Sequence, residues 1–109
     1  MSKAGFRTLG TSADVPEGYV MPYYLEDRKR RVSVARIKGW LYAFDDLSTS
    51  DGAPLSSGRL TGTVIMSQCD AACFDVITGE PVGGPAAKPL ATYEVRERGG
   101  LVEVELGSA

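Results

Sequence analysis

The dense spacing of glycine and proline is the feature that most limits how this chain can fold. The sequence holds 13 glycines and 6 prolines, and the apolar runs between them are short. Residues 102–106 alternate apolar side chains with glutamate, which is the period of a strand with one solvent-facing side. Many short strands joined by tight turns, without helical periodicity, predict an all-β fold, either a sandwich or a small barrel.

Two hairpins and one sheet edge follow from the same pattern. Runs bounded by turn residues are predicted as strands, and Lys38-Gly39 and Arg98-Gly99-Gly100 are predicted to close tight hairpins. Pro22 has no amide hydrogen for a sheet ladder, so its strand is expected at an edge. The predicted strands are residues 19–25, 31–37, 40–45, 63–66, 73–77, 91–97 and 101–106.

Length and charge set the class of protein. A chain of 109 residues is predicted to be one domain, residues 1–109, with a single core. The formal net charge of −2 gives no general attraction to nucleic acid or to an anionic membrane. No apolar run approaches the roughly 18 residues that a membrane span needs, and the N-terminal residues lack a signal-peptide hydrophobic segment. We therefore expect a cytoplasmic protein with no nucleic-acid or membrane partner.

The residue types that most enzymes rely on are scarce. The chain contains no histidine, which removes imidazole acid–base chemistry and the Ser–His and Cys–His nucleophile pairs. No phosphate-binding loop or pair of spaced carboxylates is found. We therefore expect no catalytic residue and no enzyme activity.

Cys69 and Cys73 are the only cysteines. Their C-x-x-x-C spacing differs from the C-x-x-C of thiol redox motifs. We expect two small, mostly buried thiols. A Cys69–Cys73 disulfide and a reactive Cys69 are the open alternatives.

Two short serine-containing stretches carry the most specific pattern in the chain. The first reads STS at residues 48–50, the second reads SQCD at residues 67–70, and sixteen residues separate them. WLYAFDD at 40–46 leads into the first stretch, GAPLSSGRL follows at 52–60, and CFDVITGEPVGGPA follows the second at 73–86. In spacing, turn residues and flanking strands, the sequence resembles the Rieske-type [2Fe–2S] ferredoxin family over nearly its whole length.

The resemblance implies a Rieske-like antiparallel β-sandwich with a small two-loop subdomain at about residues 46–86. The family holds its cluster by two cysteines on one iron and two histidines on the other, in the order C-x-H and C-x-x-H. By the resemblance, Ser48 and Ser67 stand where the family has cysteine, and Ser50 and Asp70 stand where it has histidine. We therefore expect no bound cluster, no other metal, and no electron transfer by this chain itself.

The four replaced positions allow two arrangements. The serine hydroxyls and Asp70 are expected to hydrogen-bond across the two loops and to backbone amides, so that the loops keep a Rieske-like path without metal. Alternatively, Ser48, Ser50, Ser67 and Asp70, with Asp51 nearby, form an oxygen-lined pocket for Ca²⁺ or Mg²⁺.

Two functions fit the resemblance. The first is an accessory or binding subunit of an oxidoreductase system, with an oxygenase or reductase component as its protein partner. The second is a ligand-substituted form of a Rieske ferredoxin whose intact parent passes electrons from a reductase to a ring-hydroxylating-type oxygenase. An exposed apolar tip is the candidate partner-binding surface, and the charged run at residues 26–31 is a solvated turn or a docking site for an acidic surface. The predicted tip residues are Leu47, Pro54, Leu55 and Pro85.

Overall fold

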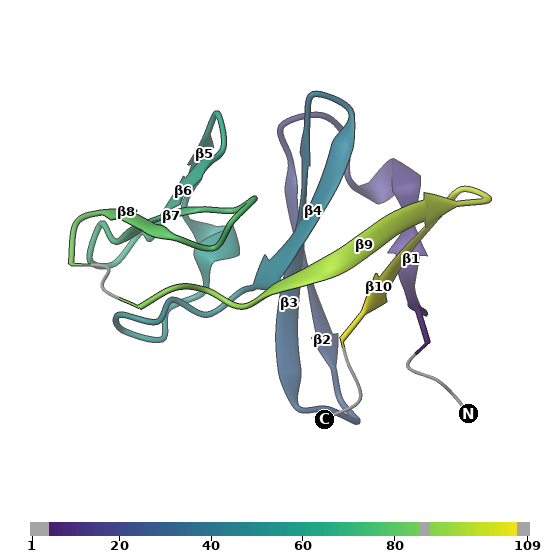
Figure 1. Cartoon of the computed structure of the whole chain (residues 1–109), viewed down its shortest axis with the longest axis horizontal. Helices are drawn as coiled ribbons and strands as arrows, with labels where there is room; N and C mark the ends of the chain where they lie inside the picture. Colours follow the sequence, from purple (N-terminus) through teal and green to yellow (C-terminus); the bar gives the residue numbers. More distant parts are fainter. Residues whose placement is uncertain (1–4, 86–87, 107–109) are drawn as a thin grey trace.

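A computed structural model describes residues 5–85 and 88–106 and shows two antiparallel sheets (Figure 1). The all-β prediction is confirmed. The six-stranded sheet has the order β1-β10-β9-β4-β3-β2, and the four-stranded sheet has the order β5-β6-β7-β8. The elements are β1 (Arg7–Thr11), η1 (Ser12–Asp14), β2 (Val20–Leu25), β3 (Arg30–Ile37), β4 (Trp40–Asp45), η2 (Leu55–Ser57), β5 (Arg59–Thr61), β6 (Val64–Met66), β7 (Cys73–Asp75), β8 (Pro81–Gly83), β9 (Thr92–Arg98) and β10 (Leu101–Glu105), where η1 and η2 are single 3₁₀ turns.

All seven predicted strands are present, and three others were missed. β5 and β8 are three residues long, too short to show an alternating pattern. The pairing of β1 with β10 shifts register between Thr8 and Gly10, so its apolar residues do not alternate cleanly. The predicted subdomain at 46–86 ends on a residue outside the described part of the chain, and the predicted domain 1–109 also extends beyond it at both ends.

The predicted turns and the predicted edge are confirmed. Lys38 and Gly39 both have positive φ, +53° and +84°, as a two-residue type I′ hairpin turn requires. The Glu17 carboxylate accepts hydrogen bonds from both of their amides. Pro22 lies on β2, an edge strand of the six-stranded sheet. At an edge, a residue without an amide hydrogen costs the sheet no hydrogen bond.

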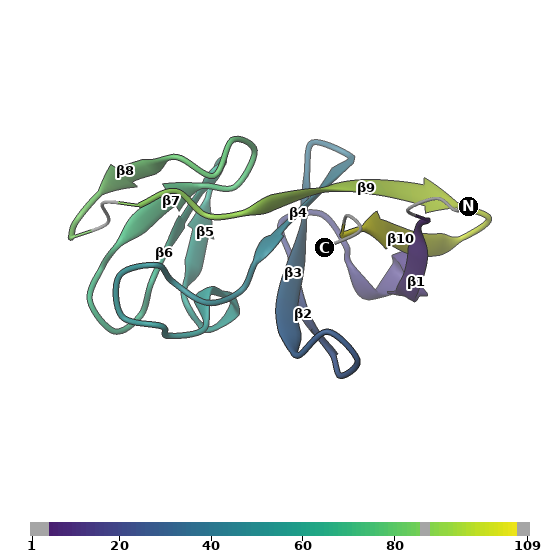
Figure 2. The same cartoon turned by 60° about the horizontal axis from the view of Figure 1, so that its bottom comes forward.

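The core lies on both faces of β3. Its alternate residues Val32 and Val34 pack inside the curved six-stranded sheet. Ala35 and Ile37 face the other way and pack against the four-stranded sheet and its loops. Figures 1 and 2 show the four-stranded sheet beside the β3–β4 hairpin, with β1 and β10 on the far side. β4, which leads into the first serine stretch, likewise contributes Ala43 to one cluster and Phe44 to the other.

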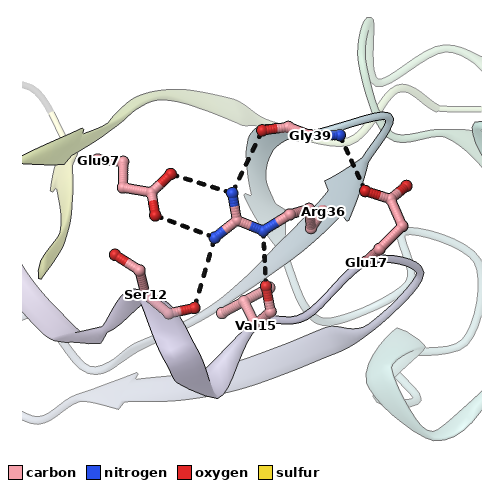
Figure 3. Close-up of polar contacts among 6 residues, drawn as sticks. All are labelled: Ser12, Val15, Glu17, Arg36, Gly39 and Glu97. Atoms are coloured by element: carbon pink, nitrogen blue, oxygen red, sulfur yellow. Dashed lines mark hydrogen bonds and ion pairs between the residues drawn. The ribbon is translucent and has the colours of Figure 1, made fainter. Parts of the chain in front are cut away.

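Arg36, on the same face of β3 as Val34, ties three separate segments together (Figure 3). Its Nε donates to the Val15 carbonyl at 2.7 Å, and its terminal nitrogens donate to both carboxylate oxygens of Glu97 at 3.0 and 3.2 Å. This guanidinium holds the pKa of Glu97 below its usual range. Because the Arg36 side chain is only 14% exposed, the ion pair has a fixed geometry rather than that of a mobile surface pair.

No helix among residues 5–85 and 88–106 is long and apolar enough to cross a lipid bilayer.

Candidate functional site

The first serine stretch forms loop 1 (residues 47–54), which is closed on itself. Leu47 and Pro54 form an isolated bridge at its base. The Ser48 amide donates to the Ala53 carbonyl at 2.9 Å, and the Ser48 Oγ accepts the Ser50 amide at 3.1 Å. Ser48 is buried, so its hydroxyl serves the loop backbone rather than solvent.

The second serine stretch forms loop 2 (residues 67–72), which has the same construction. The Ser67 amide donates to the Ala72 carbonyl at 2.8 Å, and the buried Ser67 Oγ accepts the Cys69 amide at 3.3 Å. Ala71 has a φ of +63°, which turns the chain back toward β7. Each loop therefore begins with a buried serine whose side chain bonds the amide two residues later.

One hydrogen bond joins the two loops. The Ser50 Oγ donates to the Asp70 Oδ2 at 2.6 Å, and the Asp70 Oδ1 accepts the Ala72 amide at 3.0 Å. The Ser50 hydroxyl is the main cause of a lowered pKa at Asp70, with the Ala72 amide second. The expectation that hydroxyls and Asp70 bond across the loops is confirmed for Ser50 and Asp70. The Ser48 and Ser67 hydroxyls accept backbone amides of their own loops, which confirms the other part of the expectation.

The segment after β8 contacts both loops. Gly84 has a φ of +64°, and a Cβ at this position would lie 2.2 Å from the Ala71 carbonyl oxygen. Only glycine satisfies both the backbone angle and this close approach. On the other side, the Thr49 Oγ1 donates to the Lys88 carbonyl at 2.7 Å. The two loops are thus held from outside as well as by the Ser50–Asp70 bond.

Asp46 anchors the base of loop 1. It is fully buried, and its carboxylate accepts hydrogen bonds from Arg31 Nε at 2.5 Å and Ser33 Oγ at 2.8 Å on β3. The Ser56 amide and hydroxyl in η2 also donate to it, at 2.7 and 3.1 Å. Sequence reasoning missed this residue. In the sequence, Asp46 is distinguished only by its place directly after an apolar strand. The pairing of β3 with β4 is what brings Arg31 and Ser33 to its carboxylate.

The predicted apolar tip is correct only in part. Leu47 and Pro85 are exposed and Pro54 is half-buried. The prediction was wrong for Leu55, which is fully buried and packs in the cluster between the two sheets. The 3₁₀ turn that starts at Leu55 directs its side chain inward, so Leu55 supports the loops and is not available to a partner.

The cysteines also differ from expectation. Both thiols are free, so the Cys69–Cys73 disulfide alternative is wrong. Cys69 is exposed and Cys73 is half-buried, so the prediction of two mostly buried thiols fails for Cys69. Cys69 lies at the outer turn of loop 2, where only its amide is bound.

The charged run at residues 26–31 forms the turn between β2 and β3, as predicted. The Asp27 carboxylate pairs with Arg7 across the sheet edges, at 2.6 and 2.7 Å, and this pair lowers the pKa of Asp27 to about 2. Arg30 donates to the Tyr93 hydroxyl at 2.8 Å. The run therefore contributes contacts within the sheet in addition to its exposed charges.

The carboxylate and hydroxyl oxygens of Ser50, Asp51 and Asp70, which could bind a metal ion, are already in hydrogen bonds within the chain. Ser50 and Asp70 bond each other, and the Asp51 Oδ1 accepts the Ala53 amide at 2.9 Å. Among the residues that the structure describes, no group of three or more His, Cys, Asp or Glu side chains is placed to hold a metal ion.

Comparison with known proteins identifies the family. The profile of the Rieske [2Fe–2S] domain matches residues 6–94. The chain belongs to the Rieske domain family. This Rieske-family chain is 31% identical over 93 residues to the ferredoxin component of the naphthalene 1,2-dioxygenase system of Pseudomonas aeruginosa, covering 85% of this chain and 88% of that one. The family resemblance read from the sequence is confirmed.

Solved structures agree with the Rieske assignment. The Sphingomonas yanoikuyae B1 ferredoxin superposes with a TM-score of 0.88 at 27% identity, covering 94% of this chain and all of that one. A ferredoxin bound to a reduced oxygenase in carbazole 1,9a-dioxygenase superposes with a TM-score of 0.86 at 28% identity, covering 94% of each chain. These relatives are ferredoxins, not catalytic subunits, in agreement with the prediction that this Rieske-family chain is not an enzyme.

Proposed function

We propose that this chain is a Rieske ferredoxin-like protein without a [2Fe–2S] cluster, acting as an accessory or binding component of an oxidoreductase system. Residues 1–109 form its single domain, and it works in the cytoplasm. Four residues carry the proposal: Ser48, Ser50, Ser67 and Asp70 occupy the positions of the family's cluster ligands.

The chemistry of these side chains does not fit the cluster. A Rieske cluster requires two thiolates and two imidazoles, and the chain contains no histidine at all. A serine hydroxyl must lose its proton before it can replace a thiolate. The Ser48 and Ser67 oxygens already accept loop amides, and Ser50 is committed to Asp70. We therefore derive no electron-transfer step for this chain.

The partner class follows from the relatives. The carbazole 1,9a-dioxygenase ferredoxin forms a complex with its oxygenase. We propose that an oxygenase or reductase component also binds this chain, using the exposed Leu47 and Pro85 and the half-buried Pro54.

A second candidate is the ligand-substituted form of an electron-carrying Rieske ferredoxin. The observation that favours it is serine at both cysteine positions, since serine differs from cysteine only by oxygen in place of sulfur. In this case the intact parent would pass electrons from a reductase to a ring-hydroxylating oxygenase.

Restoring the ligands separates the two candidates. The combined variant Ser48→Cys, Ser50→His, Ser67→Cys, Asp70→His is reconstituted with iron and sulfide beside the unchanged chain. A Rieske visible spectrum in the variant alone supports recent or deliberate ligand replacement in a competent frame. A variant that folds and stays colourless indicates a frame that has diverged beyond cluster assembly and supports the accessory component. A spectrum in the unchanged chain would refute both candidates.

A further inference from the structure

A small pocket with a basic lining lies where loop 1 leaves the six-stranded sheet. Val32 and Asp45 are the last pair of the β3–β4 ladder, and beyond them the Asp46 amide donates to the Arg31 carbonyl at 2.9 Å. Loop 1 therefore starts beside the first residues of β3. The pocket has a volume of about 180 Å³, and we call it the Lys29–Arg30 pocket. It is lined by Lys29, Arg30, Arg31, Asp45 and Leu47.

Tyr93 orients the Arg30 guanidinium and leaves most of its donors unused. The Arg30 Nη1 donates to the Tyr93 hydroxyl at 2.8 Å, and the guanidinium carbon lies 5.9 Å from the centre of the Tyr93 ring. A guanidinium carries five N–H donors, and this is the one hydrogen bond that the Arg30 side chain makes with the described residues. Because a carboxylate can accept two parallel hydrogen bonds from such a group, the remaining donors offer a site for one.

The lining keeps an excess of positive charge. Arg31 is already paired with a buried carboxylate. Within residues 5–85 and 88–106, neither Lys29 nor Arg30 forms an ion pair. The Tyr93 hydroxyl stays neutral near pH 7, since its pKa is about 12, and does not offset the Arg30 charge. The negative charge of the lining is that of Asp45, which accepts the Tyr93 hydroxyl and is outnumbered by the two unpaired cations.

The size and the setting of the pocket favour an acidic side chain of a protein as its occupant. Sites for small molecules usually enclose about 300–1,000 Å³, more than this pocket offers. Nucleic acids are bound through many phosphate contacts, whereas this chain has a formal net charge of −2. Leu47 is 44% exposed and lines the same pocket. An apolar contact with charged groups at its rim is the usual composition of a protein–protein interface.

We propose that the Lys29–Arg30 pocket binds the carboxylate of an aspartate or glutamate side chain of the protein partner, beside the partner contact at Leu47. The inference rests on the partner-binding role proposed above. The carboxylate accepts hydrogen bonds from the unused Arg30 donors and from the Lys29 ammonium group. Charge pairs of this kind mainly speed association and select the partner, and they weaken as the salt concentration rises.

A nuclear magnetic resonance titration of the full chain tests the proposal. The probe is an end-blocked tetrapeptide with two central glutamates between two leucines, and the same peptide with glutamines is its control. We expect the glutamate peptide alone to shift the Leu47 amide and the Arg30 Nε–H signal. Followed at the Leu47 amide, Lys29→Gln and Arg30→Gln should each weaken binding about threefold. Arg98→Gln, the same charge change at the far end of β9, should leave binding unchanged.

Any of four results overturns the proposal. The first is no shift at Leu47 with the glutamate peptide, and the second is an equal shift with the glutamine peptide. The third is unchanged affinity in both pocket variants. The fourth is displacement of the glutamate peptide by a lower concentration of inorganic phosphate, which would make the pocket a phosphate site. Because the titration uses the chain alone, these results leave the accessory role standing. A cluster in the unchanged chain would refute that role without changing the titration.

Discussion

Replacing Asp46 by asparagine should destabilise the protein through the base of loop 1. Asparagine keeps one oxygen for the Ser33 hydroxyl and the Ser56 amide, which now bind the Asp46 Oδ1. Its NH₂ group then faces Arg31 Nε and the Ser56 hydroxyl, so a charge-assisted bond at 2.5 Å becomes a contact between two donors. Such bonds contribute about 1.5–3 kcal/mol. Because the side chain is fully buried, we expect a loss of about 2 kcal/mol in the free energy of unfolding.

Urea denaturation followed by circular dichroism measures this change, and hydrogen exchange of the Ser56 amide reports its location. Asp51→Asn is the matched control, because asparagine keeps the Asp51 bond to the Ala53 amide. Arg31→Met combined with Asp46→Asn should cost less than the two single changes summed, since the residues are in contact. An Asp46→Asn protein within about 0.5 kcal/mol of the unchanged chain, the range of ordinary surface substitutions, would refute the role given to this carboxylate.

Three further predictions concern single groups. Ser50→Ala removes the main cause of the lowered Asp70 pKa, so this pKa should rise in a carboxyl NMR titration, while Ser57→Ala should leave it unchanged. The stability linked to Asp70 is present above its unfolded pKa and is lost as the pH falls through its folded pKa. Burial, and then the bond to Asp45, raise the pKa of Tyr93 to about 12, so Asp45→Asn should lower this pKa in an ultraviolet titration. The stability linked to Tyr93 is complete below about pH 10 and is lost as the pH rises through its folded pKa of about 12. Gly84→Ala should displace the segment after β8 from Ala71 and speed amide exchange in loop 2, whereas Gly99→Ala, which has a positive φ but open space around it, should leave loop 2 unaffected.

The sequence was sufficient where the signal is local. Strand period and turn chemistry predicted β2–β4, β9 and β10 and the turn at Lys38-Gly39, because each depends on residues adjacent in the chain. β1 was missed because its register shift near Gly10 breaks the alternation. The resemblance located the serine loops, and the Ser50–Asp70 bond between them agrees with that reading.

The sequence was insufficient where partners are distant. Nothing in the sequence distinguishes Arg36 from other strand residues, because its partners Val15 and Glu97 reach its guanidinium only in the folded chain. Asp46 likewise gains its role from the pairing of β3 with β4. Leu55 was misplaced because the 3₁₀ turn that begins there reverses the expected direction of its side chain.

Electron paramagnetic resonance of the unchanged chain, after anaerobic reconstitution with iron and sulfide and reduction with dithionite, tests the central claim most directly. A reduced [2Fe–2S] cluster carries one unpaired electron, so the signal counts cluster per chain. With serine at positions 48, 50 and 67, aspartate at 70 and no histidine in the chain, we expect no cluster signal. A Rieske signal that integrates to about one spin per chain would contradict the account.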